Sequence, residues 1–207
     1  MYELYGNLQS PSVRRVAIAL AYKSVSFSLV EVSSAGSGAE VDEAEFRTIN
    51  PQGLVPVFAD GDVWLSQSLA ILEYIDDKFA GPKLMPDHYA ERAKARQYAC
   101  LMVADAHSLL SRRVGRYAKE VFNIDTGALV RWHHHWWMDA FDALELLLAA
   151  DRARRRFALG DAVSIADICI VPALEAARRV GVDTDEFPCL LDIEQACHEI
   201  PAFGYDD

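Results

Sequence analysis

The chain has 207 residues, a length that fits one large domain or two small ones. Hydrophobic residues make up 52% of it and charged residues 25%, so a sizeable core can be buried and a disordered chain is excluded. The formal net charge is −11, which repels phosphate backbones and anionic lipids. We therefore expect no nucleic-acid partner and no membrane partner.

The sequence carries neither a membrane span nor an export signal that we can identify. Its longest apolar runs are well short of the roughly 18 residues that span a bilayer, and no basic segment precedes the apolar stretch near the amino end. These features predict a cytoplasmic protein. No Cys-x-x-Cys pair or zinc-type spacing is present, so we expect no metal and four reduced, structural thiols at Cys100, Cys169, Cys189 and Cys197.

The first eighty residues alternate strand and helix signals. A short aromatic strand over 2–5 precedes an amphipathic helix over 12–22, and an alternating strand over 25–32 follows. A Ser/Gly-rich loop over 33–38 and a short helix over 41–48 come next.

Asp60 and Gly61 lie between two short apolar runs, 56–59 and 62–65. This dipeptide predicts a hairpin, because a type I′ turn needs positive φ at both central positions. A helix over 67–79 follows. The order β-α-β, α, ββ, α favours a sheet in which a parallel pair is extended by antiparallel strands.

Two prolines and a glycine without periodicity occupy 81–87 and indicate a linker. The predicted organisation is a first domain over 1–80, this linker, and an all-helical domain over 88–207. Within the second domain the apolar periodicity predicts helices over 88–120, 126–150, 164–179 and 191–199.

Ser10 and Pro11 lie between the first predicted strand and the first helix. As N-cap and first helical residue they form a preferred pair for folding alone. A hydroxyl at a helix N-terminus can also donate a hydrogen bond to an anion, which the helix dipole favours as well. The residues alone leave both interpretations open, and the same holds for Ser66, Gln67 and Ser68 at the start of a later helix.

Four motifs together resemble the cytosolic glutathione transferases. They occur in the family's order and spacing over nearly the whole chain: Ser10-Pro-Ser-Val-Arg-Arg-Val16, Asn50-Pro-Gln-Gly-Leu-Val-Pro56, Gln67-Ser-Leu-Ala-Ile-Leu-Glu-Tyr74 and Gly160-Asp-Ala-Val-Ser-Ile-Ala-Asp167. The resemblance implies an α/β thioredoxin-like N-terminal domain that binds glutathione. It also implies an all-α C-terminal bundle that binds the substrate, and a homodimer.

The resemblance assigns roles by position. Ser10 corresponds to the hydroxyl that hydrogen-bonds the glutathione sulfur, with Ser12 beside it as a second catalytic candidate. A thiol of pKa about 8.5 is mostly protonated at neutral pH, and a hydroxyl at a helix N-terminus lowers that pKa toward the reactive thiolate. Val55 corresponds to the residue whose backbone pairs with the cysteinyl part of glutathione, ahead of a cis Pro56. The other implied glutathione contacts are Gln52, Gln67 and Ser68.

Within the family, the chain resembles the zeta-like maleylacetoacetate and maleylpyruvate isomerases. Segments 141–145, 170–179 and 105–113 carry this likeness, although Gln9 stands where zeta enzymes have an arginine. The implied reaction is a glutathione-dependent cis–trans isomerisation of a dicarboxylate, which guanidinium groups can bind bidentately. The candidate substrate-binding residues are Arg112, Arg113, Arg178 and His107.

Two other functions remain open at this point. A general glutathione transferase would conjugate electrophiles and would need no arginine clamp. A non-catalytic module of the same fold would serve interactions and would show neither activity.

Three adjacent histidines, 133–135, lie between tryptophans. They cannot jointly face one metal, because neighbours on a helix point about 100° apart. We expect an amphipathic helix with Trp132 and Trp136 turned inward. Ser164 and Asp167 form a capping box with Asp in place of the usual Glu, which predicts a role in folding.

Overall fold

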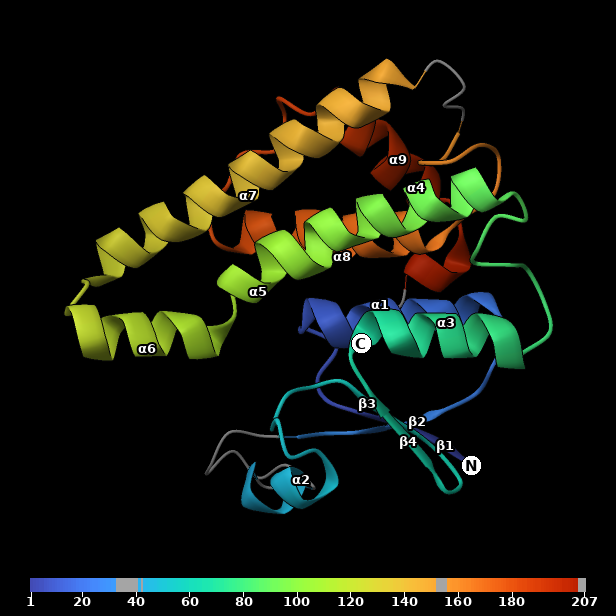
Figure 1. Ribbon diagram of the computed structural model, residues 1–207, viewed down its shortest axis with the longest axis horizontal. Helices are drawn as coiled ribbons and strands as arrows, with labels where there is room; N and C mark the ends of the chain where they lie inside the picture. The colour runs from blue at the N-terminus through green and yellow to red at the C-terminus, as the bar shows by residue number, and fades with distance from the viewer. Residues whose placement is uncertain (33–40, 42, 152–155, 205–207) are drawn as a thin grey trace. The chain divides into compact units, whose positions relative to one another are not determined.

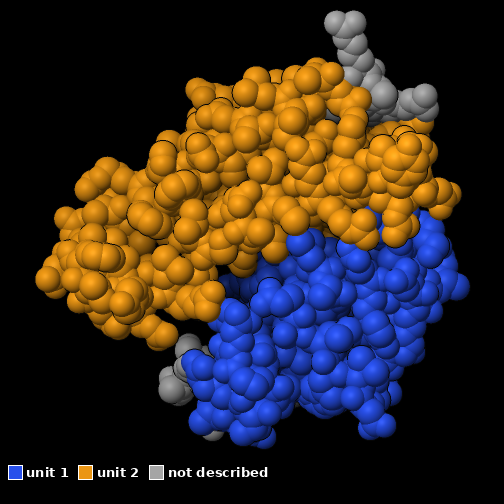
Figure 2. Space-filling view, in the orientation of Figure 1, with its two compact units in different colours: residues 1–85, 200–207 blue, residues 86–199 orange. Residues whose placement is uncertain are grey.

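The computed structural model describes residues 1–32, 41, 43–151 and 156–204. The chain divides into two compact units, Met1–Met85 with Ile200–Asp207, and Pro86–Glu199 (Figure 2). The division after Met85 lies within the linker expected over 81–87. The segment from Ile200 differs from the expectation, because it groups with the first unit.

The physical reason is a contact between the 3₁₀ turn η2 (Pro201–Phe203) and the first long helix of the chain. Arg14 of that helix donates a hydrogen bond from Nη2 to the carbonyl of Phe203 at 3.1 Å.

The first unit contains a four-stranded sheet in the order β2-β1-β3-β4 (Figure 1). β1 and β2 are parallel, whereas β1 and β3, and β3 and β4, are antiparallel, so the predicted mixed sheet is confirmed. β2 is shorter than the strand predicted over 25–32, because Val25 donates instead to the carbonyl of Leu20 at the end of the preceding helix. The strands are β1 (Tyr2–Tyr5), β2 (Ser28–Val30), β3 (Val57–Asp60) and β4 (Val63–Ser66).

The predicted hairpin between β3 and β4 is confirmed, but its turn is displaced by one residue. Asp60 pairs with Val63, so the loop consists of Gly61 and Asp62. Gly61 has a φ of 59°, and glycine at the first central position is what a type II′ turn requires.

Helices cover both faces of the sheet (Figure 1). On one face, Phe58 lies near Tyr74, with ring centroids 6.3 Å apart. On the other, Tyr5 stacks on Phe46 at 6.4 Å. The loop predicted over 33–38 lies outside the described residues. The helices of this unit are α1 (Pro11–Tyr22) and α3 (Ser68–Lys78) on the Phe58 face, and α2 (Glu43–Ile49) on the Tyr5 face.

A buried ion pair ties α1 to α3. Lys23 Nζ lies 2.9 Å from Asp76 Oδ1, and the two side chains are 0% and 4% exposed. Lys23 also donates to the carbonyl of Phe79 at 3.1 Å. Asp76 in turn accepts from the backbone N–H of Leu84 at 2.8 Å and of Met85 at 3.2 Å, so the pair fixes the end of this unit.

The second unit is helical. Within its described residues there is no strand, only an isolated bridge between Phe157 and Gly160. Among the described residues, no helix is both long and apolar enough to cross a membrane. The elements are α4 (Tyr89–Cys100), the π-helix η1 (Leu101–Ala106), α5 (His107–Leu109), α6 (Arg112–Phe122), α7 (Thr126–Ala150), α8 (Ile165–Arg179) and α9 (Pro188–His198).

The helices predicted over 126–150 and 164–179 are confirmed, whereas the single helix predicted over 88–120 is wrong. That segment turns π-helical at Leu101 and is interrupted at Ser111, which has the extended backbone (φ −65°, ψ 146°) of an N-cap. The Ser111 hydroxyl donates to the carbonyl of Ser108 at 3.1 Å. Such local hydrogen bonds compete with a continuous helix.

The last helix, α9, begins at Pro188 rather than at 191. Its N-cap residue, Phe187, makes no side-chain hydrogen bond. The carboxylate of Glu145, on α7, instead accepts from the N–H of Cys189 at 2.8 Å and of Leu190 at 3.1 Å. A residue distant in the sequence therefore caps this helix.

The capping box at the start of α8 is confirmed. Ser164 Oγ accepts from the N–H of Ala166 at 3.2 Å. Asp167 is fully buried and accepts from the N–H groups of Ser164 and Ala158, both at 2.8 Å. Burial raises the pKa of the Asp167 carboxyl above its usual range.

Replacing Asp167 with Ala removes the acceptor of two buried N–H groups. We expect Asp167→Ala to lower the free energy of unfolding by about 2–4 kcal/mol, measured by urea denaturation. Ser164→Ala removes the acceptor of the Ala166 N–H and the hydroxyl that donates to Asp167 Oδ2 at 2.8 Å, but keeps the Asp167 carboxylate, and should cost about 1 kcal/mol. Equal losses in the two variants would show that Asp167 acts only as part of the cap.

Candidate functional site

Ser10 occupies the N-cap position of α1, directly before Pro11. Its side chain makes no capping hydrogen bond; its Oγ lies 2.9 Å from Ser12 Oγ instead. The first turn of α1 carries no acidic residue, so the positive end of the helix dipole is not neutralised there. A half-buried hydroxyl and a helix N-terminus without a side-chain cap are therefore found together, as the anion-binding interpretation requires.

Ser12 connects this N-terminus to the loop before β3. It is buried, and its Oγ donates to the carbonyl of Val55 at 3.2 Å. The peptide bond between Val55 and Pro56 is cis. The structure thus brings Ser10, Ser12 and Val55 into one chain of contacts.

The N-terminus of α3 assembles three other predicted residues. Gln67 Nε2 donates to Gln52 Oε1 at 2.8 Å. The backbone of Gln67 has a φ of 71°, which is uncommon for a residue other than glycine. Residues with such strained backbone conformations cluster at ligand sites. Ser68, the first residue of the helix, is buried, and the first turn carries no acidic residue.

Arg15 is a further candidate site residue, which the sequence pattern alone did not single out. It is fully buried on α1 and donates from Nη1 to Ser68 Oγ at 3.2 Å. A buried guanidinium beside a helix N-terminus favours a carboxylate there, because both carry positive charge. The sequence signal was an arginine within an apolar helical run between Val13 and Leu20.

Arg112 and Arg113 form the first turn of α6 in the second unit. Both are exposed, so their guanidinium groups can reach a ligand. His107 is half-buried at the start of α5.

Arg178 has a different environment. Its guanidinium forms a bidentate pair with Glu194, with N–O distances of 2.6 and 2.7 Å, and its Nε donates to Thr184 Oγ1 at 2.8 Å. The Glu194 carboxylate raises the pKa of Arg178. The Arg178 guanidinium, which was predicted to bind substrate, instead pairs with Glu194 and so joins α8 to α9. We therefore leave Arg178 out of the proposed substrate site.

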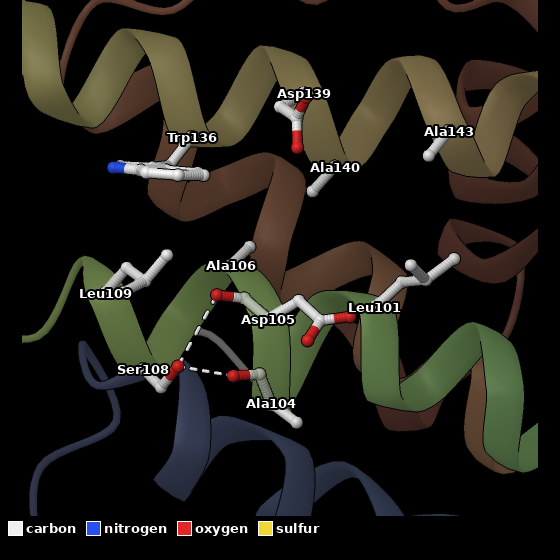
Figure 3. A pocket seen from close by; sticks show the side chains of 10 residues that line it. All are labelled: Leu101, Ala104, Asp105, Ala106, Ser108, Leu109, Trp136, Asp139, Ala140 and Ala143. Carbon is white, nitrogen blue, oxygen red and sulfur yellow. Dashed lines mark hydrogen bonds between the residues drawn. The ribbon is translucent and has the colours of Figure 1, made fainter.

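The helical unit also contains a pocket of about 410 Å³ between α7 and the segment 101–109 (Figure 3). The carboxylates of Asp105 and Asp139 come from its two sides, and the Nε1 of Trp136 is buried without a hydrogen-bond partner. The lining residues are Leu101, Ala104, Asp105, Ala106, Ser108, Leu109, Trp136, Asp139, Ala140 and Ala143.

Trp132 and Trp136, predicted to turn inward, are both half-buried: Trp132 Nε1 donates to the carbonyl of Leu109 at 3.0 Å, and Trp136 borders the pocket. Trp137, which the sequence did not single out, is more deeply buried, at 2% exposed, and stacks on Phe141 at 5.3 Å. Desolvation lowers the pKa of the neighbouring His133. In the described part of the chain, no group of three or more His, Cys, Asp or Glu side chains could hold a metal ion.

The four cysteines, all described, form no disulfide. Cys169 and Cys197 are buried, as expected for structural thiols, and burial raises the pKa of Cys197. Cys100 is exposed, so the expectation of a structural thiol is not supported by burial there.

Two family models match the sequence. Residues 4–83 match the glutathione S-transferase N-terminal domain, and residues 135–196 match the glutathione S-transferase C-terminal domain.

Individual proteins match over almost the full length. The probable maleylacetoacetate isomerase of Vibrio cholerae is 34% identical over 201 residues, which cover 97% of this chain and 93% of that protein. The holo structure of a bacterial maleylpyruvate isomerase, a zeta-class glutathione S-transferase, is similar with a TM-score of 0.91 at 35% identity, over 98% of this chain and 94% of the other. A maleylacetoacetate isomerase from Methylobacterium extorquens AM1, with bound malonate and GSH, gives a TM-score of 0.92 at 32% identity with the same coverage.

Proposed function

This chain belongs to the zeta class of the glutathione S-transferase family, and on that premise we propose that it is a glutathione-dependent cis–trans isomerase of maleylacetoacetate or maleylpyruvate. The observation that carries the proposal is the half-buried Ser10 hydroxyl at the N-terminus of α1, without a capping bond. The full-length similarity to proteins with these two isomerase names supports the choice of reaction.

The residues of the first unit fit glutathione, a tripeptide with a thiol, two carboxylates and amide groups. The backbone N–H groups at the start of α3, with Gln67 and Ser68, suit a carboxylate. The guanidinium of Arg15 donates a hydrogen bond to the Ser68 hydroxyl. Gln52, joined to Gln67 by a hydrogen bond, and the backbone of Val55 before Pro56 offer polar groups to the rest of the peptide.

When bound, glutathione supplies a thiolate nucleophile that adds to an activated double bond, allows rotation about it and is expelled again. The Ser10 hydroxyl would donate a hydrogen bond to the sulfur, and the N-terminus of α1 would add its positive potential. Both effects favour the ionised form of a thiol that is otherwise mostly protonated at neutral pH.

The proposed substrate carries two carboxylates. The exposed guanidinium groups of Arg112 and Arg113 would bind one of them, because an arginine fork matches a carboxylate bidentately. His107 is the remaining candidate for a polar contact to the substrate. On a chain of net charge −11, such a local cation pair is needed to attract a dianion.

The proposal includes a homodimeric, cytoplasmic protein. Both properties are supported by the resemblance to the cytosolic members of the family. Light scattering on the purified protein should give twice the chain mass of 23.0 kDa.

Replacing Ser10 with Ala tests the proposed mechanism. We expect Ser10→Ala to lower turnover of maleylpyruvate more than tenfold while glutathione still binds, because one hydrogen-bond donor to the developing charge is lost. Proton NMR of the substrate with and without glutathione measures turnover, and calorimetry measures binding. Ser26→Ala, at an exposed serine of the same unit, serves as the control.

The outcomes separate the three functions that the sequence left open. Unchanged turnover in Ser10→Ala would remove Ser10 from the mechanism. Conjugation of a neutral electrophile without isomerisation would indicate a general transferase. Absence of glutathione binding and of both activities would indicate an interaction module.

A further inference from the structure

The hydrogen bonds around Ser10 have a fixed direction, because one of their acceptors is a carbonyl. Ser12 Oγ lies 3.2 Å from the carbonyl oxygen of Val55 and 2.9 Å from Ser10 Oγ. A carbonyl oxygen can only accept, and a serine hydroxyl has a single hydrogen. Ser12 therefore donates to Val55, and in the contact between the two serines Ser10 is the donor.

This order directs the Ser10 hydrogen toward Ser12 and away from any ligand. For Ser10 to donate to a sulfur anion, its hydrogen must leave Ser12. Ser12 can then turn its own hydrogen from Val55 to Ser10 Oγ, since the separation of 2.9 Å suits donation in either direction. The hydrogen bonds would then run from Ser12 through Ser10 to the anion, and each would polarise the next.

When the Ser12 hydroxyl directs its hydrogen to Ser10 Oγ, the Val55 carbonyl no longer accepts a hydrogen bond from Ser12. A peptide ligand can supply another, because its amide N–H groups are donors of the same kind. Occupation of the Val55 carbonyl by a peptide N–H and donation by Ser10 would thereby favour each other. The burial of Ser12 keeps water from taking over either contact.

We infer that Ser12 is a positioning residue: its hydroxyl reverses direction when a thiol peptide binds, and so couples docking of the peptide at Val55 to stabilisation of the thiolate by Ser10. The inference rests on the proposed function, since it concerns bound glutathione. It narrows the role of Ser12 from a second catalytic hydroxyl to one that acts through Ser10.

The experiment compares the wild-type protein with Ser12→Ala. The ultraviolet absorbance of the bound thiolate, followed against pH, gives the pKa of the glutathione thiol. We expect Ser12→Ala to raise that pKa by about half a unit to one unit, the size of one hydrogen bond. Affinity for S-methylglutathione, which has no ionisable thiol, should stay within about twofold of wild type by calorimetry.

A purely structural role for Ser12, holding the loop at Val55, gives a different pattern. Both ligands would then lose affinity by the same factor, and the thiol pKa would not move. That result would overturn the inference. Ser12→Thr keeps the hydroxyl and should restore the wild-type pKa, whereas Ser12→Cys, a weaker donor, should give an intermediate value.

Two comparisons make the test complete. Thr48→Ala removes another hydroxyl that donates to a backbone carbonyl in the same unit, that of Glu45 at 2.7 Å, and should shift nothing. If Ser12→Ala does not fold, the Thr and Cys variants carry the test. A wild-type protein that binds no glutathione would overturn the proposed function and this inference together, whereas binding with an unshifted pKa in Ser12→Ala would overturn the inference alone.

Discussion

Replacing Arg112 and Arg113 together with Gln is expected to lower kcat/KM for maleylpyruvate about a hundredfold. Hydrogen bonds to charged groups contribute about 1.5–3 kcal/mol each, and about 1.4 kcal/mol corresponds to a factor of ten. Both side chains are exposed in the first turn of α6, so their replacement leaves no buried group without a partner. Proton NMR of the isomerisation at several substrate concentrations gives kcat/KM for the variant and for the wild-type protein.

The controls for this prediction lie on the same helix. Arg116→Gln removes an equal charge from an exposed position on α6 and should change kcat/KM by no more than about twofold. Changing Arg112 and Arg113 to Lys keeps the positive charge but removes the planar guanidinium that can bind a carboxylate bidentately. This variant should therefore retain only part of the wild-type activity. Conjugation of a neutral electrophile should remain at the wild-type level. Equal loss of both activities would mean that the pair supports folding or glutathione binding rather than the dicarboxylate.

Replacing Lys23 with Met is expected to lower the free energy of unfolding by about 3–5 kcal/mol, the usual cost of leaving one partner of a buried ion pair alone. Asp76 would keep the N–H groups of Leu84 and Met85 as donors but would lose its cation. Methionine fills a similar volume, so the loss reports the uncompensated charge rather than a cavity. Urea denaturation followed by tryptophan fluorescence measures it.

Lys83 provides a matched comparison, because it donates to the backbone carbonyl of the same Asp76 at 3.2 Å but is exposed. Lys83→Met should cost less than about 1 kcal/mol. Replacing both members of the buried pair, Lys23 with Met and Asp76 with Asn, should recover part of the stability, since the unpaired charge is gone and the amide oxygen can still accept from the N–H groups of Leu84 and Met85. A Lys23→Met variant no less stable than Lys83→Met would mean that the pair contributes nothing in the folded state.

The position of Ser10 beside a helix N-terminus could be predicted, but the partner of its hydroxyl could not. The sequence pattern placed a strand end, a serine and a proline in succession, which fixes an N-cap position. Whether the hydroxyl caps the helix or turns elsewhere depends on Ser12, which itself is held by the carbonyl of Val55. That carbonyl belongs to a different part of the chain.

For the candidate substrate-binding arginines too, the sequence identified the residues but not their partners. Sequence similarity selected Arg112, Arg113 and Arg178 alike. Glu194 and Thr184, which bind Arg178, follow it in the chain after the end of α8. Glu194 is on α9, and only packing of α9 on α8 brings it within hydrogen-bond distance of Arg178.

The sequence by itself determined the strand–helix order of the first unit, helices α7 and α8, the capping box of Asp167 and the hairpin near Gly61. Each depends on residues within a few positions of one another, so apolar periodicity and turn chemistry suffice to specify it. Tertiary structure decided the start of α9 through Glu145, the burial of Trp137 and the hydroxyl chain of Ser12. These depend on contacts between segments far apart in the chain, which no local pattern encodes.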